Sequence, residues 1–424
     1  MGVLLFCLLF IFMAIGVPIA FSIELSSAFT LMATHFRPLI LVAQRMVVGT
    51  DSFPLLAVPL FVLVGSLMEY GGISQRLINW ADSIVGNLTG GLGMVMILAC
   101  VVFAALTGSG PATVAAIGSI LIPAMVKKGY DKASAAGLAA AAGALGPIIP
   151  PSIPMIIYGV TANVSIPQMF IAGIIPGLFI AFLLMLTNYF VCKNKGIAGS
   201  KEALSIKKII KATWRAMGAL LLPIVILGGI YGGIFTPTEA AAVGVVYSLI
   251  VGLIFELKFK DLGHILIETT EVSTMVIFII ANANLLGWIM SAIQLPQIIA
   301  NIVVSLIHSK IVYILALNAF LFFVGAIMDT IAAIIILAPI LVPIGLSFGM
   351  NPLHLGVMFV INLVIGYVTP PFGYNLFTAC SITNLKLEEV VSGVIPFLIV
   401  EMVSVIVLFF IPQFVLWLPN ILFG

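Results

Sequence analysis

Charged residues are scarce in this chain of 424 amino acids. Asp, Glu, Lys and Arg make up 8% of it, whereas 62% of the residues are hydrophobic and the formal net charge is +2. Soluble domains carry about 25% charged residues, because a polar surface must cover the apolar core in water. The composition excludes a soluble globule and predicts an all-α protein that crosses a lipid bilayer many times. The small net charge gives no sign of a nucleic-acid partner.

Cysteine and histidine are also rare, and their spacing is uninformative. The four cysteines, Cys7, Cys100, Cys192 and Cys380, lie far apart in apolar segments, and no CxxC or Cys/His spacing indicates a metal centre. No Lys or Arg precedes Arg37, so a cleaved signal peptide with a basic start is not expected.

Glycine and proline interrupt the apolar sequence at two places in the first half. Residues 107–113 (TGSGPAT) form a polar, glycine-rich segment, and residues 146–151 (GPIIPP) end a helix of small residues. Proline lacks the N–H that a helix interior needs. Irregular backbone at membrane depth is tolerated only where protein buries it or where it lines a cavity. The two segments therefore predict a polar site inside the protein.

Both features recur in the second half in the same order. Gly108, Thr113, Ala115 and Ala116 recur 217 positions later as Gly325, Thr330, Ala332 and Ala333. Gly146, Pro150, Pro151, Gly173, Ile175 and Pro176 recur 220 positions later as Gly366, Pro370, Pro371, Gly393, Ile395 and Pro396. We therefore predict two repeats, residues 1–205 and 206–424. Paired interruptions at matching positions of two halves are typical of a transporter binding site.

The length of the apolar segments predicts ten spans and two hairpins, since a span needs about 20 apolar residues. The spans are expected at 2–16, 18–36, 52–71, 131–160, 167–192, 214–235, 237–255, 272–291, 352–383 and 394–416. Regions 88–127 and 310–345 are each expected to form a re-entrant hairpin that turns at its glycine-rich tip, and the spans at 131–160 and 352–383 to be broken helices. Amphipathic stretches at 73–86 and 295–308 are expected to lie in the membrane interface. Segments 88–160 and 310–383 would form a transport domain, with the other spans as its scaffold.

The distribution of Lys and Arg predicts the orientation in the membrane. If the first hairpin opens to the cytoplasm, fourteen of these residues lie on that side, and only Arg37, Arg45 and Lys310 lie on the other. Ten spans then place both termini outside. Five spans in each half make the two repeats inverted relative to each other.

The first candidate site pairs the tip residues Ser109, Gly110 and Thr113 with the break at Gly146 and Ile149. Hydroxyls and free carbonyls of half-helices suit a hard monovalent cation such as sodium. No Asp or Glu lies in this pair, which argues against a proton site. Substrate would contact Ser109, Pro151 and Ser152. The alternative is a packing interface, since small residues also let helices approach closely.

The second candidate site pairs the tip of the second hairpin with the second break. A second sodium ion would bind Gly325, Met328, Thr330, Gly366 and Thr369, and substrate would contact Asp329, Pro371, Tyr374 and Asn375. An ionisable residue inside a membrane segment is a functional hypothesis by default, so Asp329 could bind or steer a cation. It could equally be the N-cap of the second hairpin arm. Both interpretations stay open.

Other polar residues are expected to have structural roles. Thr236-Pro237-Thr238-Glu239 has the sequence of a capping box. Asn282 is expected to form an interhelical hydrogen bond, and Glu69 and Glu401 to reach interfacial water at span ends.

Several of these motifs together resemble the large membrane subunit of a tripartite ATP-independent periplasmic (TRAP) transporter. They are TGSGPATVAAIG, GPIIPPSIPMIIYGV, FIAGIIPG, IFTPTEAAAVG, GAIMDTIAAIIILAPILVP and VTPPFGYNLF. The resemblance implies an elevator-type fold like that of the ion transporter superfamily, sodium coupling and a bacterial inner-membrane location. It also implies a small four-helix membrane partner and a periplasmic substrate-binding protein. The expected substrates are organic acids, such as C4-dicarboxylates, 2-oxoacids or sialic acid.

The resulting hypothesis is secondary active transport, with two sodium ions at the tips and the substrate between them. Because the predicted core has no Lys or Arg, half-helix N-termini, hydroxyls and sodium would hold the anion. One alternative is a divalent-anion/sodium symporter that needs no binding protein. Another is an intramembrane hydrolase that uses Ser109, although the four histidines all fall at span ends or in loops. A passive channel is a third alternative, less favoured because paired inverted hairpins indicate alternating access.

Overall fold

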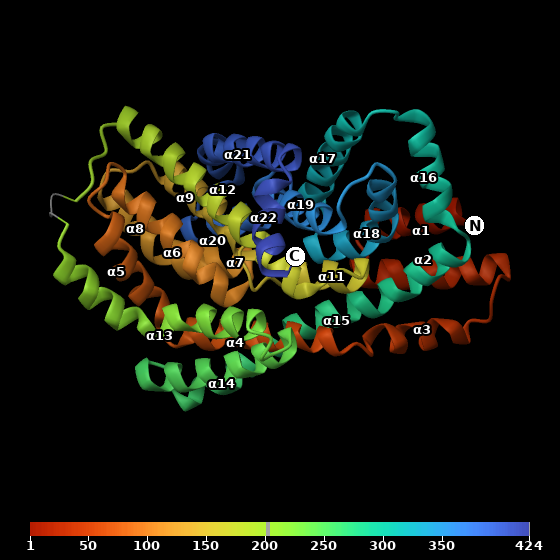
Figure 1. The fold of residues 1–424 in the computed structure, drawn as a ribbon, viewed down its shortest axis with the longest axis horizontal. Coiled ribbons are helices and arrows are strands. Elements are labelled where there is room, and N and C mark those ends of the chain that lie inside the picture. Colours follow the sequence, from red (N-terminus) through yellow and green to blue (C-terminus); the bar gives the residue numbers. More distant parts are fainter. Residues whose placement is uncertain (201–203, 424) are drawn as a thin grey trace.

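The computed structural model describes residues 1–200 and 204–423, and the regular structure of these residues is helical (Figure 1). Nine of the described helices are long and apolar enough to cross a membrane, or ten if the bent pair Lys132–Ile148 and Ile153–Ala162 counts as one span. The expected all-α membrane protein is confirmed. Lys201, one of the basic residues used to predict the orientation, lies outside the described residues.

The helices of the first half extend to residue 194. They are α1 (Gly2–Ala14), α2 (Ile19–Thr34), α3 (Ile40–Thr50), α4 (Ala57–Tyr70), α5 (Ile73–Val85), α6 (Gly91–Thr107), α7 (Gly110–Thr113), α8 (Ser119–Lys127), α9 (Lys132–Gly143), α10 (Leu145–Ile148), α11 (Ile153–Ala162) and α12 (Ile166–Asn194). A π-helical turn, Val114–Gly118, joins α7 to α8.

The helices of the second half begin at residue 206. They are α13 (Ile206–Tyr231), α14 (Pro237–Phe255), α15 (Leu262–Ala292), α16 (Leu295–Leu306), α17 (Lys310–Ile327), α18 (Thr330–Ser347), α19 (Pro352–Ile365), α20 (Tyr374–Thr383), α21 (Leu387–Phe410) and α22 (Gln413–Phe423).

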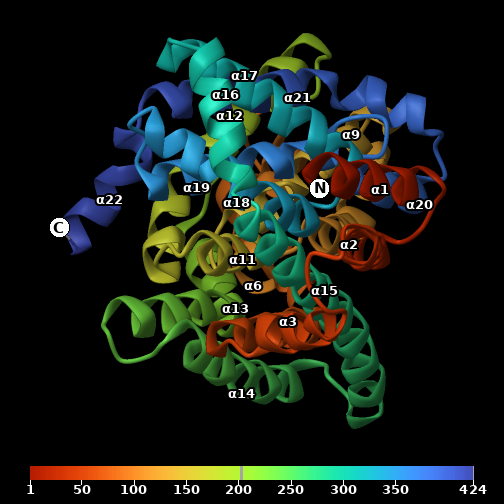
Figure 2. The same cartoon turned by 90° about the vertical axis from the view of Figure 1, so that its right-hand side faces the viewer.

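Long helices form one side of the molecule, and the interrupted helices lie above them. Figures 1 and 2 both show α3, α13, α14 and α15 along the lower side, where α14 packs on α4 and α15 packs on α3 and α4. The centre of Figure 1 holds α7, α11, α18, α19 and α20. This arrangement sets the segments of the candidate sites against a wall made by α4 and α15.

The two regions expected to form hairpins do reverse direction. The amide of Gly93, near the start of α6, donates to the hydroxyl of Tyr130, just beyond α8, at 3.3 Å. The hydroxyl of Tyr313, near the start of α17, donates to the carbonyl of Leu341 in α18 at 3.3 Å. Each pair of arms therefore lies side by side and turns at its glycine-rich tip, at Gly108 (φ +60°) in the first case.

The expected breaks at 146–151 and 366–371 are present. The helix formed by α9 and α10 ends at Ile148, and α11 begins at Ile153 after a bend of 43°. In the second half, α19 passes into a short turn at Gly366–Val368, and α20 begins at Tyr374. Prolines fill both gaps, as their missing N–H requires.

Several span boundaries differ from the prediction. The region expected as a single span at 394–416 divides into α21 and α22, because the chain leaves the helix at Ile411 and Pro412 follows. Helix α3 was not predicted, since Gln44 and Arg45 interrupt its apolar pattern. Helices α1 and α2 are apolar but are shorter than the 18 residues that the nine membrane-crossing helices have as a minimum. Helix α15 begins ten residues earlier than expected, so that Glu268 is helical.

Three predictions about polar residues can be compared with the structure. The capping box of α14 is confirmed, with Glu239 N donating to Thr236 Oγ1 at 3.3 Å and Thr236 N donating to Glu239 Oε2 at 2.8 Å. The hydrogen bond expected for Asn282 is absent, because neither side-chain polar atom has a partner among the described residues. Glu401 does not reach an interface within the described chain, since it is fully buried.

Candidate functional site

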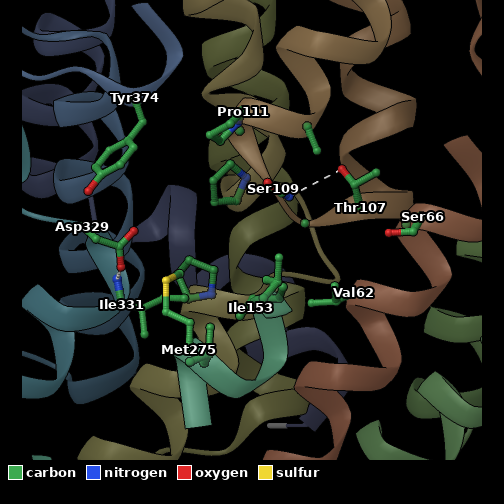
Figure 3. Close-up of a pocket in the computed structure, with 18 of the residues that line it drawn as sticks. Val62, Ser66, Thr107, Ser109, Pro111, Ile153, Met275, Asp329, Ile331 and Tyr374 are labelled. Carbon is green, nitrogen blue, oxygen red and sulfur yellow. Dashed lines mark hydrogen bonds between the residues drawn. The ribbon is translucent and has the colours of Figure 1, made fainter. Parts of the chain in front are cut away.

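One cavity of about 280 Å³ brings together the interrupted segments of both halves (Figure 3). The first half contributes the tip residues Thr107–Ala112 and the break residues Pro147, Ile153 and Pro154. The second half contributes Asp329, Ile331, Tyr367 and Tyr374, and α4 and α15 close the remaining wall. Figure 3 shows Ser109 and Pro111 on one side, facing Asp329 and Tyr374 on the other.

The first tip is held mainly by hydroxyl–backbone hydrogen bonds. Thr113 Oγ1 donates to the Ser109 carbonyl at 2.7 Å and lies 3.4 Å from Thr107 Oγ1. The Ser109 amide donates to Thr107 Oγ1 at 3.5 Å. Ser109 is the N-cap of α7, but its side chain makes no capping bond within the described chain. Its hydroxyl therefore remains available at the cavity surface.

The first break contacts this tip through backbone atoms. A Cβ atom built at Gly146 would lie 2.5 Å from the Ser109 carbonyl oxygen, so only glycine lets the two segments approach this closely. Ser152 is fully buried, accepts a hydrogen bond from Met155 N at 3.3 Å and donates to the Pro147 carbonyl. Ser152 therefore stabilises the break and the start of α11.

The second tip carries a carboxylate in a fixed position. Asp329 Oδ2 accepts hydrogen bonds from the amides of Ile331 at 2.9 Å and Ala332 at 3.3 Å, which makes Asp329 the N-cap of α18. Tyr367 donates its hydroxyl to Asp329 Oδ1 at 3.0 Å. The capping interpretation is therefore confirmed. The same carboxyl group also lines the cavity.

The second break repeats the glycine contact of the first. A Cβ atom built at Gly366 would overlap the backbone of Gly325, and one built at Gly325 would lie 2.6 Å from the Leu363 carbonyl oxygen. Thr330 is fully buried next to this contact, and its hydroxyl has no partner with hydrogen-bond geometry among the described residues. Thr369 Oγ1 donates to the Ile365 carbonyl at 3.0 Å.

Asn375 links the second break to the first half. Its Nδ2 donates to the Ala140 carbonyl in α9 at 2.9 Å. Its Oδ1 would lie 2.8 Å from a Cβ atom at Gly110 and has no hydrogen-bond partner in the described chain. A fully buried side chain of the second half thus contacts both the tip and the broken helix of the first.

The wall formed by α4 and α15 was not anticipated from the sequence. It contributes Ser66 and Glu69 from α4, and Glu268 and Met275 from α15. The interpretation of Glu69 as a span-end residue missed this role, since only the packing of α4 against α15 shows where it points. The lining has carboxylates at Glu69, Glu268 and Asp329, and no Lys, Arg or His among its described residues.

Comparison with known proteins identifies the family. The model of the DctM component of the tripartite ATP-independent periplasmic transporter matches residues 6–414. The chain belongs to this family. It is 41% identical to the C4-dicarboxylate TRAP transporter large permease protein DctM of Pseudomonas aeruginosa, over 94% of each chain. It is 38% identical to the sialic acid TRAP transporter large permease protein SiaM of Vibrio cholerae, over 96% of each chain. It is therefore a TRAP large permease subunit, which is a transporter component and not an enzyme.

One relative is longer than this TRAP subunit. The isethionate TRAP transporter permease protein DctMQ of Oleidesulfovibrio alaskensis is 43% identical over 95% of this chain, and the chain spans 64% of that protein. Among solved structures, the YdaH transporter of Alcanivorax borkumensis has a similar fold, with a TM-score of 0.53 and 14% identity, covering 88% of this chain and 87% of that one. The likeness concerns the fold alone.

The structure of this TRAP subunit divides the predicted site residues into three groups. Ser109, Gly110, Asp329 and Tyr374 line the cavity. Behind the lining, at the two tip–break contacts, are Thr113, Gly146, Ile149, Pro151, Ser152, Gly325, Met328, Thr330, Gly366, Thr369 and Asn375. Pro371 is exposed and lies outside the lining.

The donor atoms at the tip–break contacts suit an oxygen-binding cation. The buried Thr330 hydroxyl and Asn375 Oδ1 lack hydrogen-bond partners among the described residues, one beside each contact. Hard cations prefer hydroxyl, amide and carbonyl oxygens, whereas transition metals prefer imidazole and thiolate. No group of three His, Cys, Asp or Glu side chains that could hold a metal ion is found in residues 1–200 and 204–423.

Proposed function

We propose that this TRAP large permease subunit imports an organic acid by sodium-coupled secondary active transport. The observation that carries the proposal is the single cavity at which both tips, both breaks and the α4/α15 wall meet. Alternating access requires a site placed between elements that can move as a unit and elements that stay fixed. The interrupted segments and the long helices provide these two sets.

Two sodium ions bind at the two tip–break contacts in this proposal. Each contact sets a glycine of the break against the backbone of the tip, Gly146 against Ser109 in one case and Gly366 against Gly325 in the other. The ends of the interrupted helices leave backbone carbonyls without intrahelical partners. The described cavity lining has three acidic side chains and no basic one, which favours cations over anions, so an anionic substrate requires bound sodium to enter.

The substrate is an organic anion held between the tips. Relatives named for C4-dicarboxylate, sialic acid and isethionate transport support this substrate class. With no basic side chain in the described lining, bound sodium, the Ser109 hydroxyl and the N-termini of half-helices neutralise the anion. Two sodium ions carried inward with a monoanion move one net positive charge, which gains about 2.3 kcal/mol per 100 mV.

The transport domain comprises 88–160 and 310–383 and moves as an elevator against the remaining helices. The matching hairpins and breaks of the two halves support an inverted repeat, with both termini outside a bacterial inner membrane. A small four-helix membrane subunit and a periplasmic substrate-binding protein complete the transporter. The length of the DctMQ relative beyond the matched region leaves room for such a second component within one chain.

Uptake of labelled substrate into proteoliposomes tests this proposal. The permease is reconstituted with its small subunit, the loaded binding protein is added outside, and sodium, proton and potassium gradients are applied separately. We expect saturable uptake that requires inward sodium, is stimulated by an inside-negative potential, and stops when the binding protein is omitted. Undiminished uptake with a proton gradient in the absence of sodium would contradict the coupling. Undiminished uptake without the binding protein would contradict the tripartite mechanism.

A further inference from the structure

A second cavity lies away from the transport site, between α5 and the start of α13. Its volume is about 420 Å³, and it is lined by Gln75, Arg76 and Asn79 of α5, by Lys208, Lys211, Ala212 and Arg215 of α13, and by Glu256. Figure 1 shows α5 and α13 side by side at one end of the molecule, where they pack together. Four of the chain's seventeen basic residues converge on this cavity.

Arg76 is fixed in this cavity by its neighbours. Its guanidinium carbon lies 3.9 Å from the centroid of the Phe255 ring, and Nη2 lies 3.9 Å from Glu256 Oε1. Its Nε is buried and has no hydrogen-bond partner among the described residues. Stacking on an aromatic ring orients a guanidinium without using its N–H groups. Arg76 therefore keeps a donor for a further ligand.

The net positive charge of this cavity favours an anionic ligand. Glu256 offsets one of the four positive charges, and Asp82 lies in the adjoining cavity between the same helices. Lys211 and Arg215 are exposed and one helical turn apart, so they lie on one face of α13. Arginine binds phosphate through paired N–H donors, and lysine binds it through its point charge.

A hydrophobic stripe runs along α13 next to these charges. Ile206, Ile210 and Trp214 follow one another at intervals of four residues and are 76%, 65% and 76% exposed. Tryptophan is enriched at the boundary between the acyl chains and the headgroups. Basic pockets between transmembrane helices near that boundary bind the headgroups of anionic lipids. A lipid offers both a phosphate for the cavity and an acyl chain for the stripe, whereas a free phosphate offers only the first.

We propose that the cavity formed by Arg76, Lys208, Lys211 and Arg215 binds the phosphate headgroup of an anionic membrane lipid, whose acyl chain lies along Ile206, Ile210 and Trp214. The inference depends on the membrane location of the chain and on this cavity. It does not depend on the sodium coupling or on the substrate.

Native mass spectrometry of the full permease with its small subunit tests the assignment. The probes are phosphatidylglycerol, phosphatidylcholine with the same acyl chains, and glycerol 3-phosphate. We expect retention of phosphatidylglycerol in preference to the other two. Replacing two exposed basic residues of the cavity, Lys211→Gln with Arg215→Gln, should lower retention about 25-fold, because each basic residue near an anionic headgroup contributes about a fivefold factor.

Two double variants serve as controls for this test. Lys127→Gln with Lys128→Gln removes the same charge from exposed residues outside the cavity and should leave retention unchanged. Lys211→Arg with Arg215→Lys keeps the charge and should retain the lipid. Four outcomes would each overturn the proposal. Two concern retention: an equal loss of phosphatidylglycerol in both Gln pairs, or equal retention of phosphatidylcholine. The other two are displacement of the lipid by glycerol 3-phosphate at equal concentration, or by binding of the small subunit.

Tryptophan fluorescence locates the lipid independently. Brominated phosphatidylglycerol should quench the emission of Trp214, measured as the difference between the native chain and Trp214→Phe. The Lys211→Gln/Arg215→Gln pair should remove this difference. Quenching that is unchanged by the pair, or equal with brominated phosphatidylcholine, would place the lipid elsewhere and refute the assignment.

Discussion

The first and second tips share a backbone contact and differ in what holds their side chains. At the first, Gly146 touches Ser109, and a threonine hydroxyl donates to the Ser109 carbonyl at 2.7 Å. At the second, Gly366 touches Gly325, and Asp329 accepts from two amides and from the Tyr367 hydroxyl. The glycine contact is therefore the common element, and the anchoring of each tip is particular to its half.

This difference predicts unequal responses to substitution. Hydroxyl–carbonyl hydrogen bonds contribute about 0.5–1.5 kcal/mol each, whereas hydrogen bonds to a charged group contribute about 1.5–3 kcal/mol. The second tip should therefore be the more rigid of the two. The first tip should change its conformation first when the cavity opens or closes.

Substituting the shared glycines should have the largest effect. In Gly366→Ala the new Cβ would overlap the Gly325 backbone, which cannot move aside as a side chain can. We expect loss of uptake and a destabilisation of about 1–3 kcal/mol or more. Gly146→Ala should behave similarly but less severely, since its Cβ would lie 2.5 Å from a single carbonyl oxygen. Proteoliposome uptake and thermal unfolding measure both effects.

Gly287→Ala is the matched control for these variants. Gly287 lies in α15, and a Cβ atom there meets no other atom of residues 1–200 and 204–423 within 4 Å, apart from its chain neighbours and the helix's own backbone. It should keep full uptake. If Gly366→Ala is as active as Gly287→Ala, the close backbone contact has no role in transport.

Two substitutions of Asp329 should separate its role as an N-cap from the effect of its negative charge. Asp329→Ala loses the N-cap and the Tyr367 hydrogen bond, with an expected cost of about 2 kcal/mol. Asp329→Asn keeps an N-cap acceptor but removes the negative charge. We expect near-native thermal stability for Asp329→Asn and a raised sodium concentration for half-maximal uptake. An unchanged sodium dependence in the Asn variant would leave Asp329 with a capping role alone.

Tyr367→Phe should have an intermediate effect. It removes the hydroxyl that donates to Asp329 Oδ1 at 3.0 Å and leaves the buried ring in place. We expect a destabilisation of about 1.5 kcal/mol, read from the shift in thermal unfolding. Tyr247→Phe, which changes a half-buried tyrosine of α14 away from the cavity, is the control. Equal shifts in the two variants would contradict the anchoring of the second tip.

The smallest effect expected is a coupling between halves at Asn375 and Gly110. A Cβ atom at Gly110 would lie 2.8 Å from Asn375 Oδ1, so Gly110→Ala should be less harmful when Asn375→Ala is also present. A double-mutant cycle in thermal unfolding should give a coupling of about 0.5–1 kcal/mol. Additive single effects would show that the second half does not hold the first tip.

Much of the fold follows from local sequence signals. Pro150, Pro151, Pro370 and Pro371 cannot continue a helix, and the structure has breaks at those positions. The capping box at Thr236 and Glu239 was recognisable because all its atoms lie within four residues. The recurrence of glycines at offsets of 217 positions in the tips and 220 in the breaks pointed to both tip–break contacts.

Other features could not be read from the sequence because they depend on packing between distant helices. The Asn282 side chain was expected to find a partner, and none is present in the described chain. The division of the last predicted span was missed for a different, local reason: an average over apolar residues hides the single proline, Pro412, at which the helix ends.

The sequence by itself determined that this protein lies in the membrane, where its helices break, and which family it belongs to. These depend on composition, on the missing N–H of proline and on motifs that are short and contiguous. Only the tertiary structure decided that Glu69 and Glu268 face the same cavity as Ser109 and Asp329, and that Asn375 reaches across to Ala140. The physical reason is that side-chain direction in a helix bundle is set by the rotation and crossing of neighbouring helices, which no local pattern specifies.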